Sequence, residues 1–134
     1  MIYADAGIIM RLIEGAATVR NPIEARLQEL RSQSPLLLTS RLSRLECRCK
    51  ALRNRQEHLL QLYDEFFAGP EVKIGEIGAA VIERATELRA AFGFKTPDAI
   101  HAATAMLAGA WEFWTADRDF LRCPELKASL FDAS

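Results

Sequence analysis

Four acidic side chains stand where predicted strands end or predicted helices begin. Asp5 follows the first predicted strand, and Asp117 follows a strand near the end of the chain. Asp98 lies in the first turn of a helix, and Glu46 lies in the first turns of another helix. Ligands of parallel sheets bind beyond the carboxyl ends of the strands. We therefore treat these four carboxylates as candidates for one shared site.

Each acid also has an ordinary structural explanation. An acid after a strand can cap the next helix or form a turn, as Asp117 and Asp119 could, and an acid in a first helical turn stabilises the helix dipole. Glu46 could pair with Lys50, one turn later on the helix. As a cluster, however, carboxylates repel one another unless a cation such as Mg²⁺ neutralises them.

The sequence carries no other recognisable catalytic motif. A Gly-rich phosphate loop, an H-E-x-x-H helix and a G-x-S-x-G turn are all absent. A divalent ion held by carboxylates can activate water and stabilise charge on a phosphodiester. Metal-assisted phosphodiester hydrolysis is therefore the chemistry that these acids could support with nothing else present.

Composition indicates a folded chain. Half of the 134 residues are hydrophobic and 26% are charged. We expect one domain over residues 1–134, since two cores would have only about 65 residues each.

No apolar run approaches the ~18–20 residues needed to cross a bilayer, and the N-terminal MIYADAG has an acid where a signal peptide has Lys or Arg. Three cysteines without C-x-x-C spacing argue against a disulfide framework. We therefore expect a cytoplasmic protein.

Basic residues are concentrated in one segment. The net charge is −1, but residues 41–55 contain six Lys or Arg and the single acid Glu46. This segment could contact a polyanion, or it could be the solvated face of a helix. Arg53 is a candidate phosphate contact, because it lies two helical turns after Glu46 on the same face.

Short apolar strands alternate with longer helical patterns, which predicts an α/β fold with a parallel sheet. The expected strands are Ile2–Ala4, Leu36–Thr39, Val72–Ile74, Trp111–Thr115 and Ser129–Phe131. The expected helices are Ile8–Ile13, Pro22–Arg31, Ser43–Phe67, Ile77–Phe92 and one with Thr96 as N-cap that ends before Gly109. The apolar stripe of Ser43–Phe67 is expected to consist of Leu42, Leu45, Cys49, Leu52, Leu59, Tyr63 and Phe66. Both Trp111 and Trp114 are expected in the core.

Three blocks of this sequence resemble PIN-domain proteins, specifically the VapC-type toxin ribonucleases of bacterial toxin–antitoxin pairs. They are IYADAGIIMRLIE, LTSRLSRLECRCKAL and KTPDAIHAATAMLAGAWEFWTADRDF. The last block is the most specific, because an Asp-Ala-x-His helix is followed by a short strand and then Thr-x-Asp-x-Asp-Phe. The resemblance covers essentially the whole chain in order, spacing and length.

The resemblance implies a three-layer α/β/α sandwich around a short, mainly parallel sheet. It further implies an endoribonuclease that depends on Mg²⁺, with Mn²⁺ able to substitute, and a cognate antitoxin as partner. A homodimer is expected from the family and from the apolar residues on more than one face of the long helix near Leu59–Phe67. The implied metal-site acids are Asp5, Glu46, Asp98 and Asp117, with Asp119 as a further acid.

Two more residues match positions near the family's site. Thr115 matches a hydroxyl often found there, and His101 follows Asp98 by three residues, which suggests either structural hydrogen bonding or substrate contact. One departure concerns Gly7, where the family usually has Ser, Thr or Asn. The alternative function is therefore a catalytically weak PIN-like module that acts by binding RNA or protein.

Overall fold

The computed structural model describes residues 1–31 and 36–132. Within them, five parallel strands form one sheet in the order β3-β2-β1-β4-β5. The strands are β1 (Ile2–Ala4), β2 (Leu37–Ser40), β3 (Val72–Gly75), β4 (Glu112–Thr115) and β5 (Ala128–Leu130). The fold is therefore α/β with a parallel sheet, as the sequence predicts.

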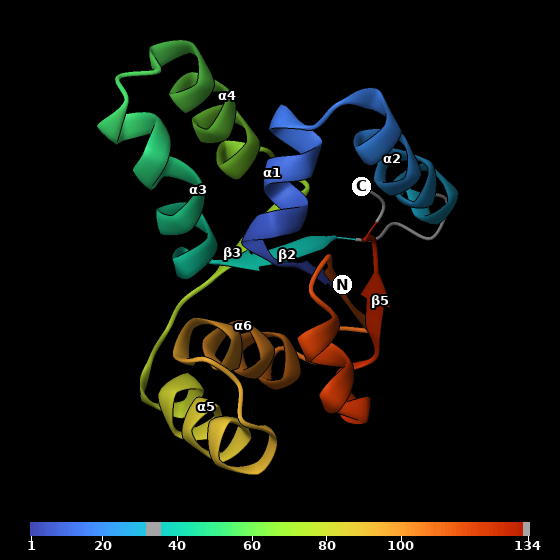
Figure 1. Cartoon of the computed structure of the whole chain (residues 1–134), viewed down its shortest axis with the longest axis vertical. Coiled ribbons are helices and arrows are strands. Elements are labelled where there is room, and N and C mark those ends of the chain that lie inside the picture. Colours follow the sequence, from blue (N-terminus) through green and yellow to red (C-terminus); the bar gives the residue numbers. More distant parts are fainter. Residues whose placement is uncertain (32–35, 133–134) are drawn as a thin grey trace.

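Helices cover both faces of the sheet (Figure 1). One face carries α1 (Ala6–Glu14), α2 (Ala17–Leu30), α3 (Arg41–Arg53) and α4 (Glu57–Ala68). The other carries α5 (Ala79–Phe92) and α6 (Thr96–Leu107), with the short 3₁₀ helices η2 (Arg118–Arg122) and η3 (Pro124–Leu126) beside them. This arrangement confirms the three-layer sandwich. No helix among the described residues is both long and apolar enough to span a membrane.

Each face of the sheet has its own hydrophobic core. Neighbouring strand residues point to opposite faces, so that Phe113 packs in the core that α5 and α6 cover, whereas Trp114 packs in the core of α1. Tyr3 stacks on Phe113 with ring centroids 5.1 Å apart. The central strands β1, β2 and β4 are mostly buried on both faces, so their sequences are largely apolar.

The order of the strands reverses at β1. After β1, the chain adds β2 and β3 on one side of it and then places β4 and β5 on the other side. Loops that leave β1 and β4 therefore diverge to opposite faces of the sheet, which leaves a crevice at the carboxyl ends of these strands. Asp5 and Asp117 lie at this crevice.

The predicted helix Ser43–Phe67 is wrong as a single element. Two helices, α3 and α4, replace it, and Arg55 between them has a left-handed φ of 53°. The turn lets α4 fold back along α3, where Asp64 forms ion pairs with Arg44 at 3.4 Å and Arg48 at 2.7 Å. Burial and ion pairing across this hairpin outweigh the continuous helical pattern.

The predicted apolar stripe of α3 is also wrong. Leu45 and Leu52 are 62% and 60% exposed, and the buried face consists of Ser43, Cys47 and Ala51. These small side chains allow α3 to approach α1 closely, and the Cys47 Sγ lies 3.8 Å from the Ala6 carbonyl oxygen.

Other differences concern the ends of elements. α2 begins at Ala17, five residues before Pro22, which lies inside the helix. Lys95, not Thr96, is the N-cap of α6. Trp111 precedes β4 and is 50% exposed, so its expected burial is wrong, whereas Trp114 is fully buried.

Candidate functional site

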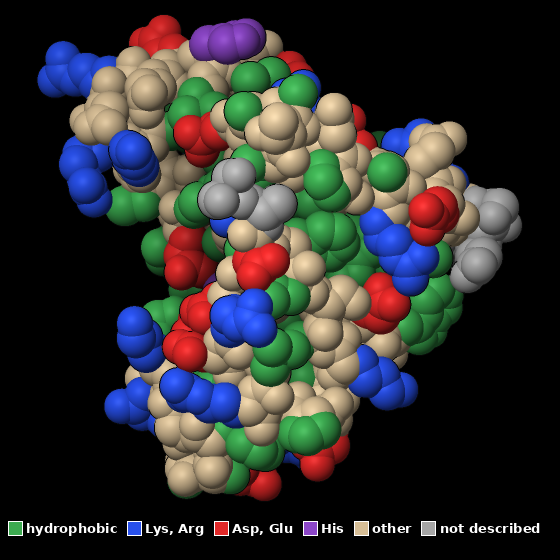
Figure 2. Space-filling model, turned by 45° about the vertical axis from the view of Figure 1, so that its right-hand side comes forward, with side chains coloured by type: hydrophobic (Ala, Val, Ile, Leu, Met, Phe, Trp, Pro, Cys, Tyr) green, Lys and Arg blue, Asp and Glu red, His purple; other side chains and the backbone are tan. Residues whose placement is uncertain are grey.

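A cleft of about 520 Å³ lies at the carboxyl ends of β1 and β4. All four predicted acids, Asp5, Glu46, Asp98 and Asp117, line this acidic cleft. In Figure 2 a hollow contains several Asp and Glu side chains and is bordered by Lys and Arg side chains. The structure thus brings together four acids that are separated by up to 112 positions in the sequence.

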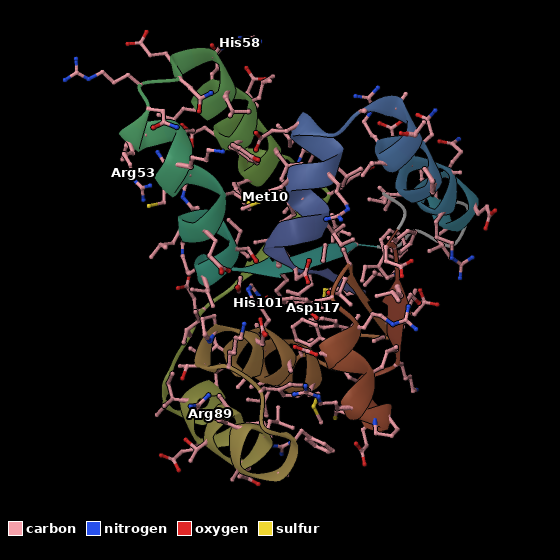
Figure 3. All side chains as sticks on the ribbon, viewed as in Figure 1. Met10, Arg53, His58, Arg89, His101 and Asp117 are labelled. Atoms are coloured by element: carbon pink, nitrogen blue, oxygen red, sulfur yellow. The ribbon has the colours of Figure 1, made fainter. Side chains whose placement is uncertain are left out.

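A slightly larger cavity, of about 570 Å³, lies between α5 and α6. Its lining is mostly apolar and contains no carboxylate, and its one charged residue is Arg89. Arg89 lies on α5, away from Asp117 (Figure 3). The larger cavity is therefore unrelated to the acidic residues.

Asp5 is held at the start of α1. Its backbone N–H donates to the Trp114 carbonyl oxygen at 3.2 Å, and its Oδ1 accepts from the Ile8 N–H at 3.0 Å as the helix N-cap. Only 7% of Asp5 is exposed, and burial raises the pKa of its carboxyl. Hydrogen bonds from the Thr115 hydroxyl and the Ile8 N–H partly oppose this rise in pKa. The capping role is thus real, and it also fixes the carboxylate at the cleft.

Asp98 and Asp117 enter the cleft from the other side of the sheet. Asp98 lies in the first turn of α6, and its pKa is raised by burial and, second, by the negative charge of Asp117. Asp117 caps η2 by accepting from the Asp119 N–H at 2.9 Å, and its own N–H donates to the Thr115 hydroxyl at 3.0 Å. Like charges therefore face each other here, although burial is the larger cause of the raised pKa.

Glu46 is fixed by a buried chain of hydrogen bonds. Its Oε1 lies 2.6 Å from His101 Nε2, and His101 Nδ1 lies 2.7 Å from the Tyr3 hydroxyl. With Glu46 ionised, Nε2 carries a proton and donates to the carboxylate, and Nδ1 accepts from Tyr3. Burial raises the pKa of Tyr3 far above its ordinary value, which keeps the hydroxyl protonated. Glu46 therefore pairs with His101 rather than with Lys50, the alternative that the sequence left open.

His101 has no ring nitrogen free for substrate. It is 3% exposed, and both nitrogens are occupied by Glu46 and Tyr3. The structure therefore supports the hydrogen-bonding role of His101 over direct contact with substrate. Figure 3 shows His101 and Asp117 near each other between the two helical layers.

Three predicted residues do not line the cleft. Thr115 is fully buried, so it acts on Asp5 and Asp117 through hydrogen bonds rather than by touching a substrate. Asp119 pairs with Arg122 at 3.2 Å, and only its backbone bonds to Asp117. Arg53 lies at the far end of α3 and contacts the Cys49 Sγ at 3.7 Å (Figure 3). Arg53 therefore lies outside this cleft, and its phosphate contact stays a prediction.

The carboxylates fit a hydrated divalent ion better than a closed protein cage. Among the residues that the structure describes, no group of three His, Cys, Asp or Glu side chains is placed to hold one ion. Asp5, Glu46 and Asp117 are each held by a local hydrogen bond, and their convergence with Asp98 on one ion stays a prediction. Mg²⁺ is usually held by one or two carboxylates, with waters and substrate phosphates completing its shell. Hard carboxylate oxygens at one cleft satisfy that requirement.

Two residues of this site were missed from the sequence. Tyr3 is an apolar strand residue by pattern, and nothing in the sequence indicates its bond to His101. Arg11 lines the cleft beside Gly7, and its position four residues after Gly7 was the available signal, since such residues share a helix face.

Gly7 leaves space between two charged groups. A Cβ at this position would lie 3.4 Å from Asp5 Oδ1 and 3.9 Å from a terminal nitrogen of Arg11. Both are ordinary van der Waals distances, so the backbone at Gly7 has room for a Cβ. The departure from the family pattern therefore removes a side chain without distorting the backbone.

Known structures provide the first comparison. A toxin–antitoxin complex from Klebsiella pneumoniae is 26% identical, with 98% of each chain covered and a TM-score of 0.73. VapBC2 from Rickettsia felis, bound to a promoter DNA fragment, is 18% identical, with 97% of this chain and 98% of that chain covered and a TM-score of 0.76. VapC20 from Mycobacterium tuberculosis, a sarcin-ricin loop cleaving toxin, is 20% identical, covering 90% and 93% with a TM-score of 0.70.

Sequence comparison gives the family. The curated proteins contain no match to this chain. The family model described as PIN domain matches residues 2–126, which is most of the chain and includes all four acids of the cleft. The chain therefore belongs to the PIN domain family.

Proposed function

We propose that this protein is an endoribonuclease that requires Mg²⁺ or Mn²⁺ and acts as the toxin of a toxin–antitoxin pair. The observation that carries the proposal is the acidic cleft, where Asp5, Glu46, Asp98 and Asp117 meet at the point at which the strand order reverses. Membership of the PIN domain family supports nuclease activity. Because cellular RNA is the proposed substrate, the proposal places the protein in the cytoplasm.

Each acid has a defined part in this proposal. Asp5, Asp98, Asp117 and Glu46 are the proposed metal ligands, and a bound divalent ion supplies an activated water and stabilises charge on the phosphodiester. Thr115 fixes Asp5 and Asp117. Asp119 supports Asp117 through its backbone N–H, so we assign it an outer position.

An antitoxin is the proposed inhibitor. The structurally similar Klebsiella pneumoniae chain is part of a toxin–antitoxin complex. The lining of the cleft contains four carboxylates but only two arginines, Arg11 and Arg118. Arg118 already pairs with Asp132 at 3.0 Å. A guanidinium from a partner would bind such carboxylates bidentately. We propose that the antitoxin places an Arg in the acidic cleft and blocks access of RNA. A complex whose cleft stays open to solvent would contradict this.

A homodimer remains part of the proposal, but α4 is not its basis. The apolar side chains of α4 from Leu59 to Phe67 are partly or fully buried. The most exposed large apolar residues are Leu45 and Leu52 on α3, and exposed apolar side chains close together are typical of interfaces. Light scattering at micromolar concentration tests the dimer, and a monomer would count against it.

Cleavage of a small stable RNA tests the function. We expect cleavage with Mg²⁺ or Mn²⁺, none with excess chelator, and recovery when the ion is added back. An RNA that is bound but not cleaved under all of these conditions would support the alternative, a catalytically weak binding module. Purified protein that neither binds nor cleaves RNA would contradict both proposals.

A further inference from the structure

Arg11 lines the acidic cleft, but its guanidinium forms no ion pair with any described residue. It lies in the last turn of α1, where a positive charge stabilises the helix dipole. That location does not explain its Nε, which is buried and has no hydrogen-bond partner within residues 1–31 and 36–132. A buried polar group left unpaired is costly, so an unpaired Nε indicates a function or an external partner.

Neighbouring arginines differ from Arg11 in this respect. Arg118, which lines the same cleft, pairs with Asp132, and Arg44 and Arg48 both pair with Asp64. Arg11 forms no ion pair with any residue that the structure describes. Its guanidinium is therefore available for an anion from outside the chain.

A second cleft, of about 310 Å³, adjoins the acidic cleft. The two share Gly7, Arg11 and Glu46 in their linings. The second cleft adds Lys50, which is exposed and without an ion pair among the described residues. Arg11 thus lies at the junction between a cleft lined by carboxylates and a cleft that carries another free cation.

Apolar side chains and Glu14 complete the second cleft, and the Glu14 carboxylate accepts a hydrogen bond from the Tyr63 hydroxyl. Met10 from α1 and Leu59 from α4 both line it, and Figure 3 shows Met10 on the side of α1 that faces α3 and α4. Gly7 lies at the junction of the two clefts, and a Cβ there would have only Asp5 and Arg11 atoms within 4 Å. A chain with regularly spaced anionic groups and flat apolar groups between them fits this lining.

We propose that the two clefts form one path for single-stranded RNA, in which Arg11 binds a phosphate next to the bond that is cut and Lys50 binds a following phosphate. The proposal rests on the proposed nuclease function and adds the course that the RNA strand takes along α1 and α3. An arginine contacts phosphate through paired N–H groups, and Arg11 lines both clefts without an ion pair to any described residue. The apolar walls contact the sugar or base between the two phosphates.

RNA fits this path better than an acidic peptide does. The phosphate charge repeats along the strand, which matches two cations on successive parts of one path. A phosphodiester approaching four carboxylates also needs a nearby cation to offset repulsion. Arg11 satisfies that need from within the chain.

Salt-dependent RNA binding tests the proposal without any cleavage. A short, unstructured, fluorescein-labelled RNA is titrated in excess chelator, and its anisotropy gives Kd at several salt concentrations. For single strands, each phosphate contact contributes about 0.7 to the slope of log Kd against log salt. We expect Arg11→Met to raise Kd roughly tenfold and to lower that slope by about 0.7. Arg11→Lys should keep the slope, because it keeps the charge.

Two further variants make the test specific. Arg84→Met is the matched control, because Arg84 is an arginine of α5 that lies outside both clefts and 3.9 Å from Glu87. It should bind RNA as the parent does. Lys50→Met should lower the slope as Arg11→Met does, and its exposed position keeps the test valid if Arg11→Met does not fold.

The outcomes separate this proposal from the proposed function. If Arg11→Met and Lys50→Met show the parent's slope of log Kd against log salt, the RNA path is overturned, even if the parent cleaves RNA. Conversely, a lower slope in both variants of a protein that cuts no RNA would support the path and contradict the nuclease. If both variants bind RNA as the parent does but bind a polyglutamate peptide more weakly, the second cleft is a peptide site and the proposal is overturned.

Discussion

Tyr3→Phe tests the hydrogen bonds that hold Glu46. The variant removes one hydroxyl and keeps the ring that stacks on Phe113 at 5.1 Å. His101, which is 3% exposed, then loses the partner of its Nδ1 at 2.7 Å. An unsatisfied buried group costs about 1–3 kcal/mol, so the free energy of unfolding should fall by about that amount. For a chain of this length the unfolding midpoint should fall by roughly 3–10 °C.

The same variant should also slow catalysis. Tyr3 is fully buried and cannot contact RNA, so its loss acts only through His101 and Glu46. Loss of groups that orient metal ligands typically costs about 10–100-fold in activity or metal affinity. We therefore expect kcat for RNA cleavage to fall about 10–100-fold at saturating Mn²⁺, with KM for RNA unchanged.

Thr104→Val is the matched control for this experiment. Thr104 is a buried residue of the same helix as His101, and its hydroxyl donates to the Ile100 carbonyl oxygen at 2.7 Å. Its removal should change stability by less than about 1 kcal/mol and leave kcat unchanged. If Tyr3→Phe has the same unfolding midpoint and the same kcat as the parent, the hydrogen-bond chain has no role. If only its stability falls, the chain supports the fold and does not position Glu46.

Three further predictions concern the acidic cleft and its immediate neighbours. Because burial raises the pKa of Asp5 and Asp98, the folded state keeps protons that the unfolded state loses above pH 3.8. In chelator, the free energy of unfolding should therefore fall as pH rises through the raised pKa values, and urea titrations should show a weaker fall for Asp98→Asn; an equal fall would contradict this origin. Gly7→Ser should cleave RNA as fast as the parent or faster, since the backbone at Gly7 has room for a Cβ, and slower cleavage in a rate assay would show that the open space is needed. Asp119→Asn should reduce the cleavage rate less than Asp117→Asn, because Asp119 contributes its backbone and pairs with Arg122; the reverse order would place Asp119 at the metal.

Much of the fold was predictable from local pattern. The central strands are short, largely apolar runs because both of their faces are buried. Asp5 follows β1 directly, and Asp117 follows β4 by two residues. The parallel order then brings the acids together without any detail of side-chain packing. This explains why the acids of the cleft could be listed from the sequence.

The errors arose where tertiary contacts decide. The break between α3 and α4 depends on Arg55 in a left-handed conformation and on ion pairs to Asp64, which no helical periodicity contains. Exposure of Leu45 follows from close packing of α3 on α1 through small residues.

The most direct test of the account is RNA cleavage by Asp98→Asn beside the parent. Asn keeps nearly the shape of Asp98 and removes the charge that a metal ion requires, and Asp98 lies in the first turn of α6, where the helix does not depend on it for a cap. With equal folded protein and saturating Mn²⁺, we predict that the single-turnover rate falls by orders of magnitude while circular dichroism is unchanged. Cleavage by Asp98→Asn at the parental rate would contradict the assignment of the acidic cleft as the nuclease site.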